Sequence, residues 1–171
     1  MDRNTTCCFT GHRPEKLPWG SDESDTRCIR LKLQIDEAVE QAYLDGIRHF
    51  ICGMAQGSDL YFCEAVLKLR QCYQDITLEA ARPYEAQAKS WPEEEQNRYQ
   101  GILDQCNYET LVQHIYTPGC MQRRNRYMVD RSELVIAVYN GELKGGTAQT
   151  LSYALRNHRK IHILEPEEEL V

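Results

Sequence analysis

The stretch Leu134-Val135-Ile136-Ala137-Val138-Tyr139 is a run of six apolar residues with no polar residue between them. Strands that are covered on both faces lose the alternation of polar and apolar residues, and such strands are typical of parallel sheets. A turn with three glycines follows at residues 140–146, and a helical pattern follows at residues 147–156. The order strand, turn, helix predicts an α/β fold.

The same order repeats along the chain. Strands are predicted at residues 5–9, 47–52, 76–81, 110–116, 134–139 and 161–164. Helices are predicted at residues 27–44, 59–71, 84–105, 121–132 and 147–156, with Pro92 dividing the third of them in two. This alternation indicates a Rossmann-like α/β fold, in which a mainly parallel sheet has helices on both faces. The length suits one domain, which we expect to span residues 1–171.

The composition narrows the function and the location. A formal net charge of -6 argues against broad binding to a phosphate backbone, so a nucleic-acid partner is not expected. No apolar run is long enough to cross a membrane, and the first residues lack the pattern of a signal peptide, so we expect a cytoplasmic protein without membrane contact. The eight cysteines form no C-x-x-C pair, which favours reduced, core-filling thiols over a metal site or a disulfide framework.

Glycines and polar residues stand directly after three of the predicted strands. They are Thr10, Gly11, His12 and Arg13; Gly53, Gly57, Ser58 and Asp59; and Gly145, Gly146 and Thr147. Parallel sheets bind ligands outside the carboxyl ends of their strands, so one topology would bring the three turns together. Glycines allow close approach of the backbone, and free N–H groups at helix starts attract anions. The arrangement predicts a cleft that holds an anionic group, for which Arg13 offers a forked donor.

Each turn also has an ordinary structural interpretation. The polar residues after the first strand could be solvated loop residues. Ser58 and Thr147 fit the N-cap position of the helices that follow them, and capping suits Asp59 better than direct ligand contact. Three such turns at one edge of the sheet therefore indicate a ligand site more strongly than any single turn does.

A basic helical segment adds a further candidate at residues 121–132. Arg123, Arg124 and Arg126 cannot all point the same way on a helix. One of them, together with Asn125, could face the cleft. The others are expected to be solvated or paired with carboxylates.

Three motifs together resemble the SLOG superfamily, specifically its YpsA-like branch: CFTGHRP at residues 8–14, GMAQGSD at residues 53–59 and GGT at residues 145–147. The superfamily includes the DNA-processing protein DprA, whose glycine turn is similar to residues 53–59. It also includes the LOG phosphoribohydrolases, whose Arg-bearing helix and Gly-Gly turn are similar to residues 124–146. The resemblance implies a Rossmann-like fold and a nucleotide or nucleotide-derived ligand, ADP-ribose-type compounds included, with Arg124 contacting a phosphate. It further implies a homodimer and a protein partner in cell division or the stress response.

The chain departs from the LOG pattern at the catalytic carboxylate. LOG enzymes carry a glutamate after the Gly-Gly turn, whereas this chain has Gln149 and neither Asp nor Glu at the matching place. Whether the protein is an enzyme stays open, and no cofactor is certain. We expect a sensor or regulatory module that binds a nucleotide-type ligand. The alternatives are an N-glycosidic hydrolase that uses His12, Asp59 or Glu142 as its acid, and a protein that binds single-stranded DNA.

Overall fold

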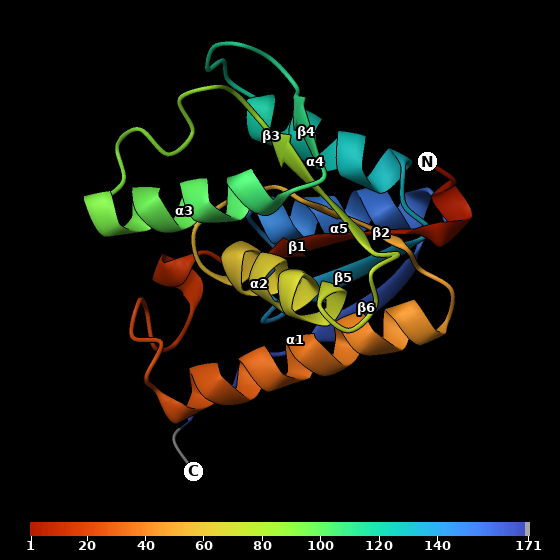
Figure 1. Ribbon diagram of the computed structural model, residues 1–171. Helices are drawn as coiled ribbons and strands as arrows, with labels where there is room; N and C mark the ends of the chain where they lie inside the picture. Colours follow the sequence, from red (N-terminus) through yellow and green to blue (C-terminus); the bar gives the residue numbers. More distant parts are fainter. Residues whose placement is uncertain (170–171) are drawn as a thin grey trace.

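The computed structural model describes residues 1–169 and contains a six-stranded sheet in which every pair of neighbouring strands is parallel. The strand order is β4-β3-β2-β1-β5-β6 (Figure 1). The strands are β1 (Thr6–Gly11), β2 (His49–Cys52), β3 (Thr77–Arg82), β4 (Tyr108–Leu111), β5 (Leu134–Val138) and β6 (Lys160–Leu164). The predicted parallel sheet is confirmed.

Helices cover both faces of this sheet. They are α1 (Thr26–Leu44), α2 (Ser58–Arg70), α3 (Glu93–Gln105), α4 (Cys120–Asp130) and α5 (Gly146–Arg156). Helices α1 and α2 pack against one another on one face, with α3 beside α2, while α4 and α5 pack together on the other face (Figure 1). This arrangement confirms the Rossmann-like α/β architecture. No helix within residues 1–169 combines the length and the apolar composition needed to cross a membrane.

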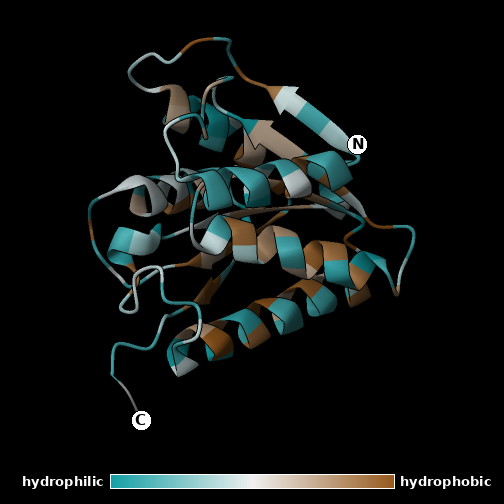
Figure 2. Ribbon diagram, turned by 60° about the vertical axis from the view of Figure 1, so that its left-hand side comes forward, coloured by the Kyte–Doolittle hydropathy of each residue, from teal (hydrophilic) through white to brown (hydrophobic). Residues whose placement is uncertain are grey.

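Side chains alternate along the strands between two hydrophobic cores, one on each face of the sheet. Cys7 and Phe9 of β1 join the core under α1 and α2, where Phe9 stacks on Phe62 with ring centroids 4.7 Å apart. Cys8, between them, joins the core under α4 and α5. Because both faces of the strand are buried, the three residues at its centre are all apolar. In Figure 2 the helices mix hydrophobic and hydrophilic residues, as expected for elements with one buried side.

The eight cysteines are free thiols in this structure. Six of them are fully or nearly fully buried: Cys7, Cys8, Cys28, Cys52, Cys63 and Cys120. They pack as small hydrophobic side chains, as the sequence predicts.

Two predicted elements, one helix and one strand, have other boundaries in the structure. The helix expected from residue 84 begins only at Glu93, after Pro92, and residues 84–91 form turns instead. The strand expected at residues 110–116 is β4, which ends at Leu111. Beyond it, Ile115 and Tyr116 lie 73% and 60% exposed in a loop, so their apolar character does not reflect burial in the sheet.

The connections create a switch point at the carboxyl edge of the sheet. Strand β1 pairs with β2 on one side and with β5 on the other, and its last residue, Gly11, lies opposite Val138. The chain therefore leaves β1 toward one half of the sheet and later returns to the other half. The helix after β1, α1, and the helix after β5, α5, lie on opposite faces of the sheet, and a ligand site is expected where the connections part in this way.

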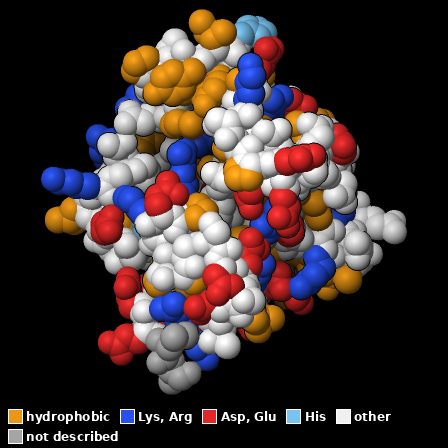
Figure 3. All heavy atoms as spheres, turned by 90° about the vertical axis from the view of Figure 1, so that its left-hand side faces the viewer, with side chains coloured by type: hydrophobic (Ala, Val, Ile, Leu, Met, Phe, Trp, Pro, Cys, Tyr) orange, Lys and Arg blue, Asp and Glu red, His pale blue; other side chains and the backbone are white. Residues whose placement is uncertain are grey.

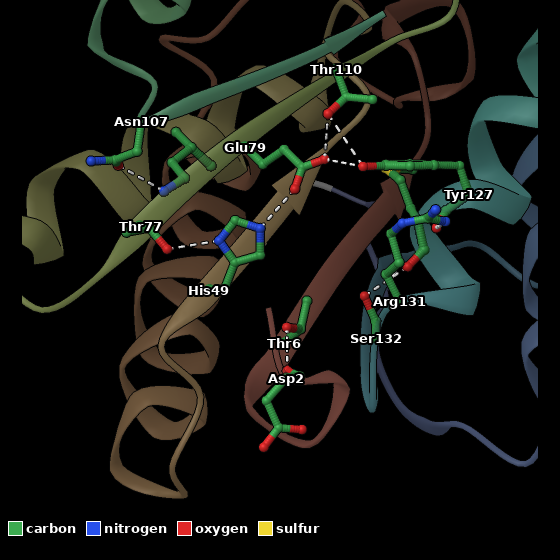
Figure 4. A network of polar contacts seen from close by, with 12 residues as sticks. Asp2, Thr6, His49, Thr77, Glu79, Asn107, Thr110, Tyr127, Arg131 and Ser132 are labelled. Carbon is green, nitrogen blue, oxygen red and sulfur yellow. Dashed lines mark hydrogen bonds and ion pairs between the residues drawn. The ribbon is translucent and has the colours of Figure 1, made fainter. Parts of the chain in front are cut away.

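A buried polar cluster lies between the sheet and α4, away from this switch point (Figure 4). His49 Nε2 donates to Glu79 Oε1 at 2.8 Å, and His49 Nδ1 lies 2.7 Å from Thr77 Oγ1. The other oxygen of Glu79 accepts from the Tyr127 hydroxyl at 2.6 Å and from the Thr110 hydroxyl at 2.9 Å. Three strands and one helix are joined by this one carboxylate.

Candidate functional site

A cleft of about 280 Å³ opens at the switch point. Its wall comes from the end of β1 and the loop after it, the turn before α2, the inner side of α4 and the start of α5. The lining residues are Phe9, Thr10, Gly11, His12, Arg13, Glu15, Lys16, Ala55, Asp59, Met121, Arg124, Asn125, Met128, Gly145, Gly146 and Thr147. Figure 3 looks onto this edge of the molecule, where basic and acidic side chains both reach the surface. The structure thus brings together ten of the thirteen residues that the sequence singles out.

His12 ties three loops of the cleft together. Its backbone N–H donates to the Val138 carbonyl at 3.3 Å, and its ring Nε2 accepts from the N–H of Asn140 at 3.1 Å. Its carbonyl accepts from the hydroxyl of Ser58 at 2.8 Å. Burial lowers the pKa of the imidazole, which favours the neutral ring that this acceptor role requires. His12 therefore joins the ends of β1 and β5 to the turn before α2 at the wall of the cleft.

The three predicted residues that do not line the cleft are Gly53, Gly57 and Ser58. Gly57 has a φ of 83°, and a Cβ there would lie 3.1 Å from the His12 carbonyl and 2.9 Å from Pro14. The Gly53 carbonyl accepts from the guanidinium of Arg124, and a Cβ on Gly53 would collide with that guanidinium at 2.5 Å. These glycines permit close packing of the turn under the cleft.

The capping role predicted for Ser58 is wrong. Gly57 is the N-cap of α2, and the Ser58 hydroxyl is directed to His12 because the two loops pack directly on one another. The same turn holds Met54 at a φ of 62°, although it is not a glycine. Left-handed backbone at a buried methionine is conformational strain that the surrounding packing sustains.

Arg124 and Asp59 form the buried charged floor of the cleft. Arg124 is 4% exposed, and its Nε donates to Asn125 Oδ1 at 2.8 Å. Asp59 is 5% exposed and accepts from the N–H of Ala55 at 3.0 Å, so its carboxylate caps the turn and also lines the cleft. Burial raises the pKa of the Asp59 carboxyl to about 6, although the charges of Arg124 and Arg13 and the Ala55 N–H oppose the rise.

The start of α5 supplies uncapped backbone N–H groups. Gly145 is the N-cap, with a φ of 106°, and no side chain caps the helix. Thr147 is therefore not the cap predicted from the sequence; it lies inside the first turn and is buried. Because first-turn N–H groups have no partner within the helix, they attract anions to this part of the cleft.

The sequence reasoning missed Lys16, which lies across the mouth of the cleft. Its Nζ lies 3.1 Å from Glu142 Oε2, so it links the loop after β1 to the loop after β5. A Cβ on Gly145 would lie 2.4 Å from this amine. A lysine two residues after a proline in a turn carries no sequence signal of such a contact, because Glu142 is distant in the chain.

Replacing Gly145 with alanine should lower the free energy of unfolding by about 1–3 kcal/mol, because its backbone conformation is one that only glycine adopts readily. The added methyl would also displace Lys16 from Glu142. Gly146→Ala is the matched control, since a Cβ there meets no atom within 4 Å. Urea unfolding should place the control within about 1 kcal/mol of the parent protein. Equal losses in the two variants would contradict the assigned conformation.

Comparison with known proteins places the chain in a family. A family model named YpsA and described as the YspA SLOG family matches residues 7–168. The SPbeta prophage-derived protein YoqJ of Bacillus subtilis (strain 168) is 31% identical over 143 residues, which cover 76% of this chain and 83% of YoqJ. The protein YpsA of the same organism is 26% identical over 152 residues, which cover 85% of this chain and 82% of YpsA.

A solved structure shares the fold of this chain. DNA processing protein A (DprA) from Helicobacter pylori, a structure described by its single-stranded DNA binding mode, superposes with a TM-score of 0.63 at 16% sequence identity. The match covers 94% of this chain and 65% of the DprA chain, so this chain spans less than two thirds of that protein. The chain belongs to the YpsA family of the SLOG superfamily.

Proposed function

We propose that the cleft binds the phosphate group of a nucleotide or nucleotide-derived ligand, and that the protein acts as a sensor or regulatory module. The observation that carries the proposal is the meeting of Arg13, Lys16 and Arg124 with the uncapped start of α5 in one cleft. Cationic side chains and free N–H groups are the donors that phosphate oxygens accept from. They lie at the switch point, where Rossmann-like sheets bind their ligands.

The size and charge of the cleft favour a small ligand over a nucleic-acid strand. A cleft of about 280 Å³ lies just below the usual range for small-molecule sites, about 300–1,000 Å³, so it suits a small ligand. The chain as a whole carries a net charge of -6, which repels a long phosphate backbone. A regulatory role would be exerted through a second copy of the chain or through a protein partner that senses the occupied cleft.

Nucleoside 5′-monophosphates should raise the melting temperature, because a ligand that binds only the folded state stabilises it by mass action. Replacing Arg13 with glutamine should abolish this shift with little change in the unliganded melting temperature, since Arg13 is exposed at the cleft. Arg3→Gln removes the same charge beside Glu133, outside the cleft, and should leave the shift intact. An unchanged shift in Arg13→Gln would count against the cleft as the phosphate site.

A second candidate function is hydrolysis of a nucleotide N-glycosidic bond, which the pKa of Asp59 favours. A buried carboxyl that titrates at about 6 in a cleft can hold or release a proton near neutral pH. In such a reaction water would be added across the bond, giving free base and ribose 5-phosphate. Release of base from a nucleoside monophosphate that Asp59→Asn abolishes, while binding persists, would establish the enzyme and remove the binding-only interpretation.

A further inference from the structure

A second cavity lies in the groove between α4 and α5, next to the cleft. Its volume is about 270 Å³, and Asn125 lines both cavities. Along α5, Gly146 and Thr147 line the cleft, whereas Ala148 and Gln149, directly after them, line the groove. The two cavities are therefore neighbours at the first turn of α5, with Asn125 between them.

The charge of the groove is opposite to that of the protein as a whole. Arg126 and Arg156 line it, and no Asp or Glu is among the described residues of its wall. A nearby carboxylate, Asp130, accepts a hydrogen bond from the Tyr153 hydroxyl at 2.7 Å. Residues 117–164, which include α4 and α5, hold eight Lys and Arg residues against three Asp and Glu residues, although the chain carries a net charge of -6. The groove is thus suited to an anion.

Contacts between the two helices set the spacing along the groove. Gln122 Nε2 donates to Gln149 Oε1 at 2.5 Å, and the Arg126 guanidinium lies 5.3 Å from the centre of the Tyr153 ring. Tyr153 follows Gly146 by seven residues, which corresponds to about 10 Å along a helix. A free phosphate cannot occupy both places. A nucleoside with a phosphate on each side of its ribose covers most of this distance, and the long side chain of Arg126 can reach over the remainder.

We propose that the groove between α4 and α5 binds a second phosphate group of the ligand, so that the ligand is a nucleotide with two separated phosphates. The first phosphate lies in the cleft at the start of α5, and the second lies between Arg126 and Arg156. The amides of Gln122, Asn125 and Gln149 face the middle of the ligand. This inference rests on the proposed function, because the first phosphate is held by the cleft.

The test is isothermal titration with nucleoside 5′-monophosphates and nucleoside 3′,5′-bisphosphates of the four common bases. The bisphosphate of the preferred base should bind at least about tenfold more tightly than its monophosphate, since hydrogen bonds to charged groups contribute that much. Arg126→Gln and Arg156→Gln should each lose most of this gain and leave the affinity for the monophosphate unchanged. Arg131→Gln is the matched control, because Arg131 lies over the Tyr127 ring and outside the groove.

The outcomes distinguish failure of the groove from failure of the proposed function. A bisphosphate that gains nothing, or a gain that survives both substitutions, overturns the groove and leaves the proposed function standing. Absence of binding by both probes overturns the proposed function and the groove together. Affinity that keeps increasing with the length of a single strand, up to about ten nucleotides, would assign the basic face to nucleic acid and overturn the two-phosphate ligand.

Discussion

Replacing Glu79 with leucine should lower the free energy of unfolding by about 3–5 kcal/mol at about pH 7, because three donors inside the protein would each lose an acceptor that is worth about 1–3 kcal/mol. The Glu79 carboxylate accepts hydrogen bonds from His49, Tyr127 and Thr110, and the His49 side chain is 2% exposed. Leucine would leave all three donors without this acceptor inside the protein. Urea unfolding of the parent and variant proteins measures the loss.

The pH dependence gives this prediction a second readout. Burial alone would raise the pKa of the Glu79 carboxyl, but hydrogen bonds from His49, Tyr127 and Thr110 outweigh it and hold the pKa below its ordinary value. A lowered pKa stabilises the fold above the unfolded value of about 4.3, and this contribution disappears as the pH falls through the lower, folded-state pKa. The free energies of unfolding of the parent protein and of Glu79→Leu should therefore become more similar below about pH 4.

Glu109→Gln is the matched control for Glu79. The Glu109 carboxylate lies 2.5 Å from the guanidinium of Arg82 on the neighbouring strand, but the Glu109 side chain is 44% exposed. Pairs at the surface contribute at most about 1 kcal/mol, so the control should be nearly neutral. A loss of the same size in both variants, or a Glu79→Leu loss that does not change with pH, would show that the buried cluster has no special role.

The sequence predicts the layers and the edge of the sheet that holds the cleft because both follow from local patterns. Apolar runs such as residues 134–138 mark strands with two covered faces, and the glycine turns after them mark the carboxyl edge. Once the strands are parallel, residues as distant as Gly11 and Gly146 must lie at one edge. The convergence of the cleft residues follows from that constraint.

The roles of individual side chains depend on neighbours that are distant in the chain. Gly53 supports Arg124 across 71 residues, and Lys16 meets Glu142 across 126 residues. No periodicity encodes such pairs. Residue composition alone favours a helix at residues 84–91, because it does not reveal that the buried Gln87 donates to the Gly53 carbonyl, 34 residues away. Ser58 shows the same limit, since only the packing of two loops directs its hydroxyl to His12.

Arg124→Leu should lower the free energy of unfolding by about 3–5 kcal/mol at about pH 8 and should abolish phosphate binding in the cleft. Arg124 is buried, and its positive charge offsets part of the burial penalty on Asp59. The Gly53 carbonyl keeps a second donor, Gln87 Nε2 at 3.0 Å, so the backbone of the turn stays hydrogen-bonded in the variant. The loss in stability should therefore come mainly from the uncompensated carboxylate of Asp59.

A double-mutant cycle with Asp59→Asn tests this cause. Asp59 has a folded-state pKa of about 6, above its unfolded value, so its contribution favours folding at low pH and is lost as the pH rises through about 6. Without Arg124 that pKa rises further, so the cost of Arg124→Leu should be large at about pH 8 and small at about pH 5. In the Asp59→Asn background the same substitution should cost less, by about 0.5–3 kcal/mol, and should lose its pH dependence. If the two substitutions add within about 0.5 kcal/mol at both pH values, the charges are independent, and Arg124 is then held in the cleft wall by its hydrogen bonds alone.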